Sequence, residues 1–112
     1  MTTVTFYRTQ DGRLLAVDLL GHAGYAEEGE DIVCAAISSS VQLVHALLYD
    51  VQRIAVDTLI EDEGAHIRLT LPHDQLDAGQ DGLSAFRLHL TELAENYSEF
   101  IKVTEVYNDA AD

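Results

Sequence analysis

A glycine-rich segment between a strand pattern and a helix pattern constrains this chain more than any other feature. Gly21, Gly24 and Gly29 lie in residues 21–30, which have no hydrophobic period and are therefore predicted to form a flexible surface loop. The apolar run 14–20 before the loop is typical of a central strand. Asp31 after the loop is a predicted helix N-cap, because its carboxylate can accept hydrogen bonds from the free N–H groups of a first helical turn. The chain is therefore expected to pass from a sheet, through this loop, into a helix.

Hydrophobic periodicity predicts the other elements. The remaining strands are expected at 3–9, 54–61, 65–71 and 100–106, with turns at Asp11-Gly12 and at residues 62–64. A helix is expected from Asp31 to about Tyr49, with an apolar stripe that includes Leu47. Residues 73–82 are expected to be a connection with a frayed helix start, followed by a second helix from Leu83 to residues 96–98. The order ββαββαβ predicts a two-layer α+β domain with about five strands and two helices.

The length of the chain suits a single domain. The 112 residues are enough to bury a core without disulfides or metals. We expect one domain at 1–107 and a small, polar, disordered tail at 108–112.

Charge and cysteine content limit the partners and the compartment. Twenty acidic and six basic residues give a formal net charge of −14, which repels nucleic-acid phosphates and anionic membrane surfaces. The sequence therefore predicts no direct nucleic-acid partner and no membrane partner, and it favours a basic partner. A simpler interpretation is that the acidic surface only keeps the protein soluble. The single cysteine and the absence of a signal-peptide pattern at the start favour a cytoplasmic protein.

The loop and the helix start carry a thiol and an imidazole. Cys34 is the only cysteine and lies at the third position of the predicted helix, twelve residues after His22. An ordinary thiol is mostly protonated at neutral pH, so a nucleophilic cysteine needs a base or a positive neighbour. The helix N-terminus can supply the positive neighbour, and His22 can act as the general base. A buried structural role for a lone cysteine is the competing interpretation.

Neighbouring residues are candidates for supporting roles. Asp31 could orient His22 as well as cap the helix, and Ser38 could hydrogen-bond the thiolate or only its own helix. The backbone N–H groups of Cys34 and Ala35 are expected to form an oxyanion hole. Negative charges on the loop would disfavour a thiolate if they lay close to it, so we expect Glu27 and Glu28 to face the substrate.

Nothing in the sequence predicts a metal or a cofactor. The other histidines lack the spacing of metal ligands, and no phosphate-binding or dinucleotide motif occurs. These histidines are His45, His66, His73 and His89.

The motif resembles a known family. The run Gly21-His22-Ala23-Gly24 and the run from Gly29 to Ala36 closing on Ser38 are similar to the ribosomal-processing cysteine protease (Prp) family. The resemblance extends over nearly the whole chain. It implies a cysteine endopeptidase, in which we expect His22 to activate Cys34. From the residues themselves we also expect a substrate loop of Gly21, Gly24, Glu27, Glu28 and Gly29, because its glycines let the backbone approach a substrate closely. The resemblance also implies that the substrate is the N-terminal extension of a large-subunit ribosomal protein, removed during ribosome assembly, and that the enzyme is a homodimer.

Two other functions remain open at this point. A non-catalytic acidic module could bind a basic ribosomal protein segment without cutting it. A redox sensor could use the same thiol, although the chain holds no second cysteine to resolve an oxidised sulfur.

Overall fold

The structure is a computed structural model that describes residues 1–27 and 29–107. The elements follow the predicted order ββαββαβ, so the α+β prediction is confirmed. The predicted tail at 108–112 lies outside the described residues. In chain order the elements are β1 (Thr2–Arg8), β2 (Leu14–Leu20), α1 (Ile32–His45) with a π-helical continuation (Ala46–Val51), β3 (Asp57–Glu61), β4 (His66–Thr70), a 3₁₀ turn (His73–Gln75), α2 (Leu76–Asn96) and β5 (Ile101–Tyr107).

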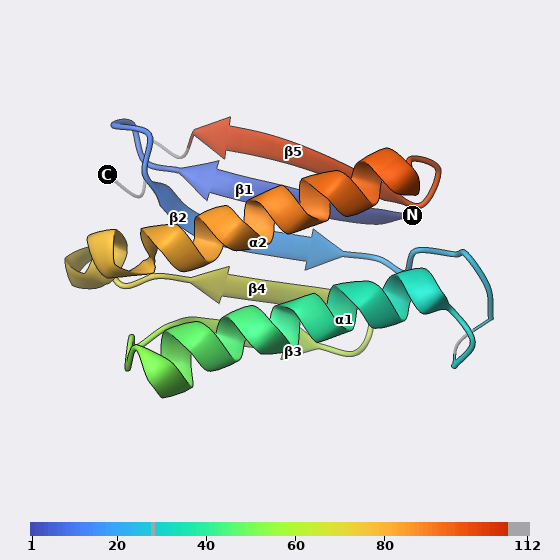
Figure 1. The fold of residues 1–112 in the computed structure, drawn as a ribbon, viewed down its shortest axis with the longest axis horizontal. Helices are drawn as coiled ribbons and strands as arrows, with labels where there is room; N and C mark the ends of the chain where they lie inside the picture. Colours follow the sequence, from blue (N-terminus) through green and yellow to red (C-terminus); the bar gives the residue numbers. More distant parts are fainter. Residues whose placement is uncertain (28, 108–112) are drawn as a thin grey trace.

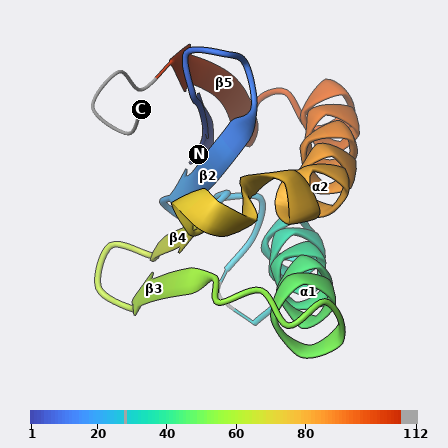
Figure 2. The ribbon, with the colours of Figure 1, turned by 90° about the vertical axis from the view of Figure 1, so that its left-hand side faces the viewer.

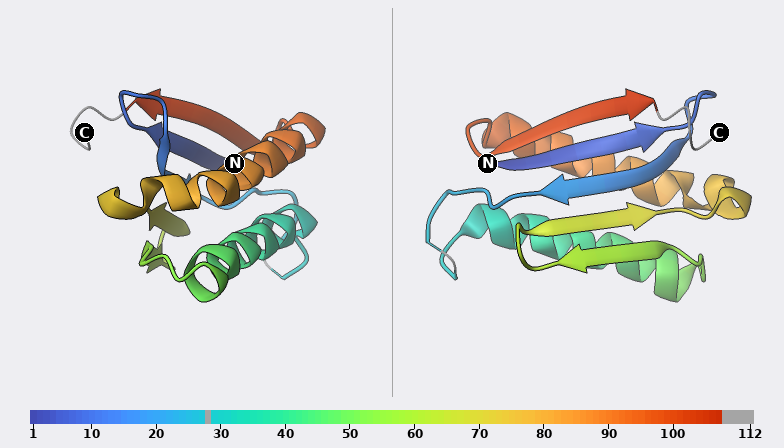
Figure 3. Two further views of the ribbon diagram at one scale, coloured as in Figure 1. Left: turned by 60° about the vertical axis from the view of Figure 1, so that its left-hand side comes forward. Right: turned by 180° about the vertical axis from the view of Figure 1, so that it is seen from behind.

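The strands form one five-stranded sheet in the order β3-β4-β2-β1-β5. β2 lies at the centre, as its apolar sequence predicts, and β1 pairs with it in antiparallel register and with β5 in parallel register. Both helices pack on one face of the sheet, which gives two layers (Figures 1 and 2). The view from behind in Figure 3 shows that no helix formed by the described residues covers the other face.

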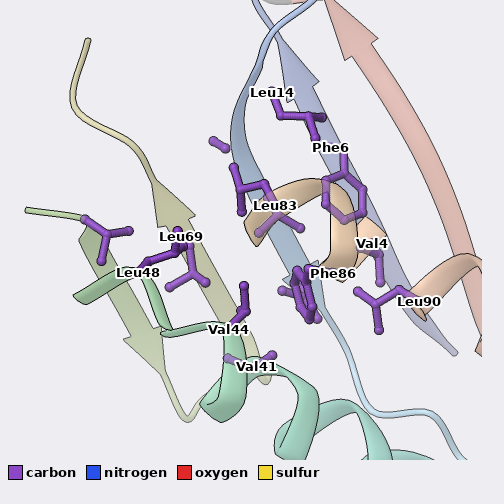
Figure 4. Packing of buried hydrophobic residues seen from close by; sticks show 14 of the residues in the cluster. Val4, Phe6, Leu14, Val41, Val44, Leu48, Leu69, Leu83, Phe86 and Leu90 are labelled. Atoms are coloured by element: carbon purple, nitrogen blue, oxygen red, sulfur yellow. The ribbon is translucent and has the colours of Figure 1, made fainter. Parts of the chain in front are cut away.

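The core lies between the sheet and the two helices. Alternate residues of β1, Val4 and Phe6, are fully buried, and Phe6 packs edge-on against Phe86 of α2 with ring centroids 6.1 Å apart. Figure 4 shows Val41 and Val44 of α1 pointing into the same core. The buried face of α1 and its π-helical continuation consists of Val33, Ile37, Val41, Val44 and Leu48. The predicted stripe was wrong at Leu47, whose side chain is 37% exposed.

The second helix begins earlier than predicted. It starts at Leu76, so residues 76–82 are helical and not a connection. The glycines of this segment indicated a break, but they serve close packing. A Cβ on Gly79 would lie 2.6 Å from the Leu71 methyl groups, and one on Gly82 would lie 3.0 Å from Leu48. Glycine leaves room for this close approach, because a Cβ at either position would have to displace a leucine side chain.

The third strand is shorter than predicted. Ile54 and Val56 are buried. The Ile54 N–H donates to the Leu48 carbonyl, and the Val56 N–H donates to the Ile54 carbonyl. Because these bonds run back to the π-helical segment and within the connection, ladder pairing with β4 begins only at Asp57. The apolar residues predicted as a strand start therefore anchor the crossover from α1.

The segment Ile32–Val51 has the length and composition of a membrane span, with mean hydropathy 1.7. This is weak evidence for a span, because a core helix passes the same test and the apolar face of this one packs on the sheet.

Three segments meet at one end of the sheet. Figure 1 shows the C-terminal end of β2, the start of α1 and the β3–β4 turn close together, with the N-terminus beside them. The glycine-rich loop connects β2 to α1 at this end, so the fold brings the predicted site residues to one place.

Candidate active site

Asp31 is the N-cap of α1. Its Oδ1 atom accepts hydrogen bonds from the backbone N–H groups of Val33 at 3.0 Å and Cys34 at 2.9 Å. These bonds satisfy two of the N–H groups that a helix start leaves free. The cap therefore fixes the backbone that carries the thiol.

The second carboxylate oxygen of Asp31 holds the loop. Oδ2 accepts from the N–H groups of Tyr25 at 2.9 Å and Ala26 at 3.3 Å. Burial raises the pKa of Asp31, but the backbone donors of Cys34, Ala26 and Tyr25 outweigh burial, and the net pKa lies below its usual value. The carboxylate stays ionised at neutral pH and ties the loop to the helix.

The loop is also fixed at its start and its middle. Gly21 has a φ of +91°, and a Cβ there would lie 2.7 Å from the Met1 carbonyl oxygen. Its N–H donates to the Ala65 carbonyl and its own carbonyl accepts from Thr2 Oγ1. The Tyr25 ring packs edge-on against Tyr97 at the end of α2 and against Phe100 before β5, with centroids 5.9 and 5.2 Å apart. The loop residue next to the site is thus anchored by the opposite helix.

The sulfur of Cys34 faces the loop. Sγ accepts a hydrogen bond from the backbone N–H of Ala23 at 3.3 Å. Ala23 is buried, whereas Cys34 is partly exposed and packs beside the core. A backbone N–H group of the loop is therefore aimed at the sulfur. No hydrophobic pattern marks Ala23, so the sequence alone does not predict this donor.

Two hollows adjoin the sulfur, and three residues line both of them: His22, Cys34 and Ser38. The first has a volume of about 500 Å³ and lies between the loop and α1. The second has a volume of about 570 Å³ and lies between α1 and the ends of β3 and β4, where Ile60, Glu61 and Asp62 line it. Both are open to solvent, and His22 is exposed. A peptide crossing the sulfur would have room on either side.

The substrate loop is brought to the site in part. Gly21 lines the second hollow, and Gly24, Gly29 and Asp31 line the first. Glu27 is exposed and lines neither hollow, and Glu28 lies outside the described residues. Ser38 is exposed at the cleft, one turn after Cys34.

The predicted oxyanion hole is wrong in its donors. The Cys34 N–H donates to the Asp31 carboxylate and the Ala35 N–H donates to the Asp31 carbonyl. The cap therefore occupies the N–H groups that a free helix start would offer.

A histidine that sequence reasoning left unassigned borders the cleft. His66 Nε2 lies 2.5 Å from Asp18 Oδ1 and Nδ1 lies 3.1 Å from Glu61 Oε1. The Asp18 carboxylate, followed by Glu61, raises the pKa of His66. Arg68 also donates to Asp18, at 3.0 Å. Only the register of β4 between β2 and β3 brings these groups together, so spacing along the chain could not reveal the cluster.

No group of three His, Cys, Asp or Glu side chains suited to a metal ion occurs within residues 1–27 and 29–107.

Comparisons with known proteins place the chain among proteases. The sequence model of the family described as Cysteine protease Prp matches residues 1–102. The ribosomal processing cysteine protease Prp of Staphylococcus aureus is 30% identical over 107 residues, covering 92% of this chain and 97% of that protein. A crystal structure of Prp from S. aureus with a covalently linked product peptide superposes with a TM-score of 0.88 at 26% identity, covering 95% of this chain and 100% of the other. The same protease with a substrate peptide gives a TM-score of 0.81 at 26% identity, covering 96% and 100%.

Proposed function

The chain belongs to the Prp family of cysteine proteases, and we propose that it removes the N-terminal extension of a large-subunit ribosomal protein during ribosome assembly. The observation that carries the proposal is the position of Cys34. Its sulfur lies at the start of α1, receives a backbone N–H and adjoins two solvent-open hollows that His22 also lines. The relatives named above support the substrate class, because they are described as ribosomal processing proteases and one of them is bound to a substrate peptide.

The proposed reaction uses two side chains. His22 takes the proton of the Cys34 thiol, and the thiolate attacks the carbonyl carbon of the scissile peptide bond. When the C–N bond breaks, the imidazolium gives its proton to the leaving amine and the N-terminal fragment stays on sulfur as a thioester. Water, deprotonated by His22, then hydrolyses the thioester and restores the thiol. No cofactor or metal enters these steps.

The surrounding residues support this reaction by position. The Ala23 N–H already points at the sulfur at 3.3 Å, so it can keep donating to the sulfur after His22 has taken the proton. Asp31 acts as a positioning residue, because it holds both the Cys34 backbone and the loop that follows His22. Ser38 can contact a substrate in either hollow.

The loop carboxylates are proposed to attract a basic peptide. Glu27 is exposed outside both hollows, where its charge can act on a peptide without lying against the sulfur. The double change Glu27→Gln and Glu28→Gln is expected to weaken binding of a basic peptide while the rate of alkylation of Cys34 stays nearly the same. Unchanged peptide affinity would contradict this role.

We also propose that the enzyme is a cytoplasmic homodimer. The surface that supports a dimer is a hollow of about 700 Å³ between α1 and α2, lined by Leu43, Leu47 and His89 among others. Leu43 is 74% exposed there. An exposed apolar surface of this kind often marks an interface. Multi-angle light scattering of the wild type should give twice the chain mass, and Leu43→Asp should give the mass of one chain.

The experiment that tests the proposed activity uses peptides and mass analysis. Purified protein is incubated with synthetic N-terminal segments of the large-subunit ribosomal proteins of the same organism. One of them is expected to be cut, and the cut should be lost in Cys34→Ala and His22→Ala while both variants keep the circular dichroism spectrum of the wild type.

The other outcomes of this experiment contradict the proposal. Binding of a peptide without cleavage, unchanged in Cys34→Ala, would favour a non-catalytic acidic module. Cleavage that persists in Cys34→Ala would exclude the thiol mechanism.

A further inference from the structure

We propose that the substrate peptide lies extended along the outer edge of β3 and hydrogen-bonds to it as an added strand, which leads its scissile bond to Cys34. This inference rests on the proposed protease function and adds to it a second substrate-binding element. The occupant of the strand edge is the substrate peptide itself.

β3 is an edge strand whose outer side is unpaired among the described residues. It ends the sheet and pairs only with β4 among the described residues, and each of its five residues is exposed. Leu59 is 42% and Ile60 is 65% exposed. Soluble proteins usually protect such an edge with charged side chains, above all lysine, or with proline, a bulge or a covering segment. This strand has no lysine, proline or bulge, and its only charged residues are Asp57 and Glu61 at its two ends.

The C-terminal end of β3 borders the cleft. Ile60, Glu61 and Asp62, at the end of β3 and in the following turn, line the same hollow as Cys34 and Ser38. Figure 1 shows β3 running toward the end of the sheet where α1 begins. A peptide that leaves the sulfur through this hollow therefore meets β3 at its C-terminal end and can continue along it.

The charge of the hairpin suits a basic peptide. Asp57 and Glu61 lie on β3, Asp62 and Glu63 follow in the turn, and no lysine or arginine occurs from Ile54 to Ala65. All four carboxylate residues are exposed, and the Glu61 carboxylate also contacts His66. Unpaired backbone groups give such an edge affinity for any extended chain, and the carboxylates favour a cationic one.

Strand addition makes a specific prediction about backbone amides. In a paired edge strand, N–H groups point alternately toward the partner and away from it. A peptide strand would cover the outward N–H groups of residues 57–61 and leave the already bonded ones as they were. Docking by side chains alone would protect neither the outward N–H groups nor the bonded ones from exchange.

The test is amide hydrogen exchange of Cys34→Ala with and without the synthetic ribosomal peptide that the wild type cuts. We expect exchange to slow about tenfold or more at alternate residues of β3, with slower exchange also in residues 21–31. Slowing confined to 21–31, with cleavage by the wild type intact, would overturn the strand addition and leave the protease function standing. If the wild type cuts no peptide, both proposals fail.

A matched pair of charge variants supplies an independent readout. Asp57 lies at the far end of β3 and lines neither hollow at the sulfur. Asp57→Lys is expected to raise the KM for the basic peptide about fivefold with kcat unchanged, the size of a surface charge effect. Asp81→Lys, which makes the same net charge change at an exposed position of α2, should alter KM less than about twofold. Equal effects of the two variants would overturn the proposal.

Discussion

At the scale of single residues, Asp31 connects stability to chemistry. One carboxylate oxygen caps α1 under Cys34, and the other holds the N–H groups of Tyr25 and Ala26. Sequence alone predicted the cap, because an Asp before an apolar helical pattern is typical of an N-cap. It could not predict the loop contact, because that bond depends on how the loop folds back over the helix.

Two substitutions separate these roles of Asp31. Asparagine keeps one accepting oxygen for the cap but places an NH₂ group against the loop donors. Asp31→Asn should therefore change the thermal midpoint little. It should lower kcat/KM by about 100-fold, because a small misplacement of reacting groups has an effect of this size. Asp31→Ala should lower both. Thermal melts and peptide kinetics of the two variants check this. Full activity in Asp31→Asn would show that the loop contact has no role in catalysis.

His66 gives the protein a pH-dependent contribution to stability. Its pKa is raised by Asp18 and then by Glu61, so its protonated form is favoured in the folded protein. That contribution is complete below the ordinary histidine pKa of 6.5 and is lost as pH rises through the raised folded value. His66→Gln should therefore lower the thermal midpoint more at about pH 6 than at about pH 9. An equal loss at both pH values would contradict this linkage.

At the scale of elements, the long periodic segments were predictable and their ends were less so. β2 was predicted with its observed bounds, because it combines an apolar run with clear turn signals on both sides. The predicted start of α2 was wrong because glycines such as Gly79 and Gly82 can indicate either a flexible chain or close packing. Only the distances to Leu71 and Leu48 distinguish them.

The packing role of Gly79 can be tested by adding one methyl group. Alanine favours a helix over glycine by about 0.5–1 kcal/mol, but overpacking a core costs about 1–3 kcal/mol. Because the new Cβ would lie 2.6 Å from buried Leu71, Gly79→Ala should destabilise the protein by about 1 kcal/mol in urea unfolding. The added change Leu71→Val should recover part of the loss. A stabilised Gly79→Ala variant would show that Leu71 moves aside freely.

At the scale of the whole molecule, the formal net charge of −14 acts on every charged molecule that approaches the protein. Attraction of a basic peptide over the acidic surface is screened by salt, since the Debye length falls from about 10 Å at 0.1 M to about 3 Å at 1 M. Raising salt over this range should increase the KM for a basic peptide with a smaller change in kcat. A peptide with its lysines replaced by glutamine should show little salt dependence. Identical salt responses of the two peptides would show that charge does not guide binding.

The site as a whole illustrates what a sequence contains and what it omits. Cys34, His22 and Asp31 could be singled out from residue type and position. The Ala23 donor, the β3 edge and the His66 cluster could not, because each depends on contacts between segments far apart in the chain or on a backbone group that any residue carries.

The most direct test of the thiol mechanism is the intact mass of the protein, quenched in acid during turnover of a cleavable ribosomal peptide. A thioester mechanism predicts a species heavier by the mass of the N-terminal fragment less one water, attached at Cys34 and absent from Cys34→Ala. Turnover without any such species, together with cleavage by Cys34→Ala, would contradict it.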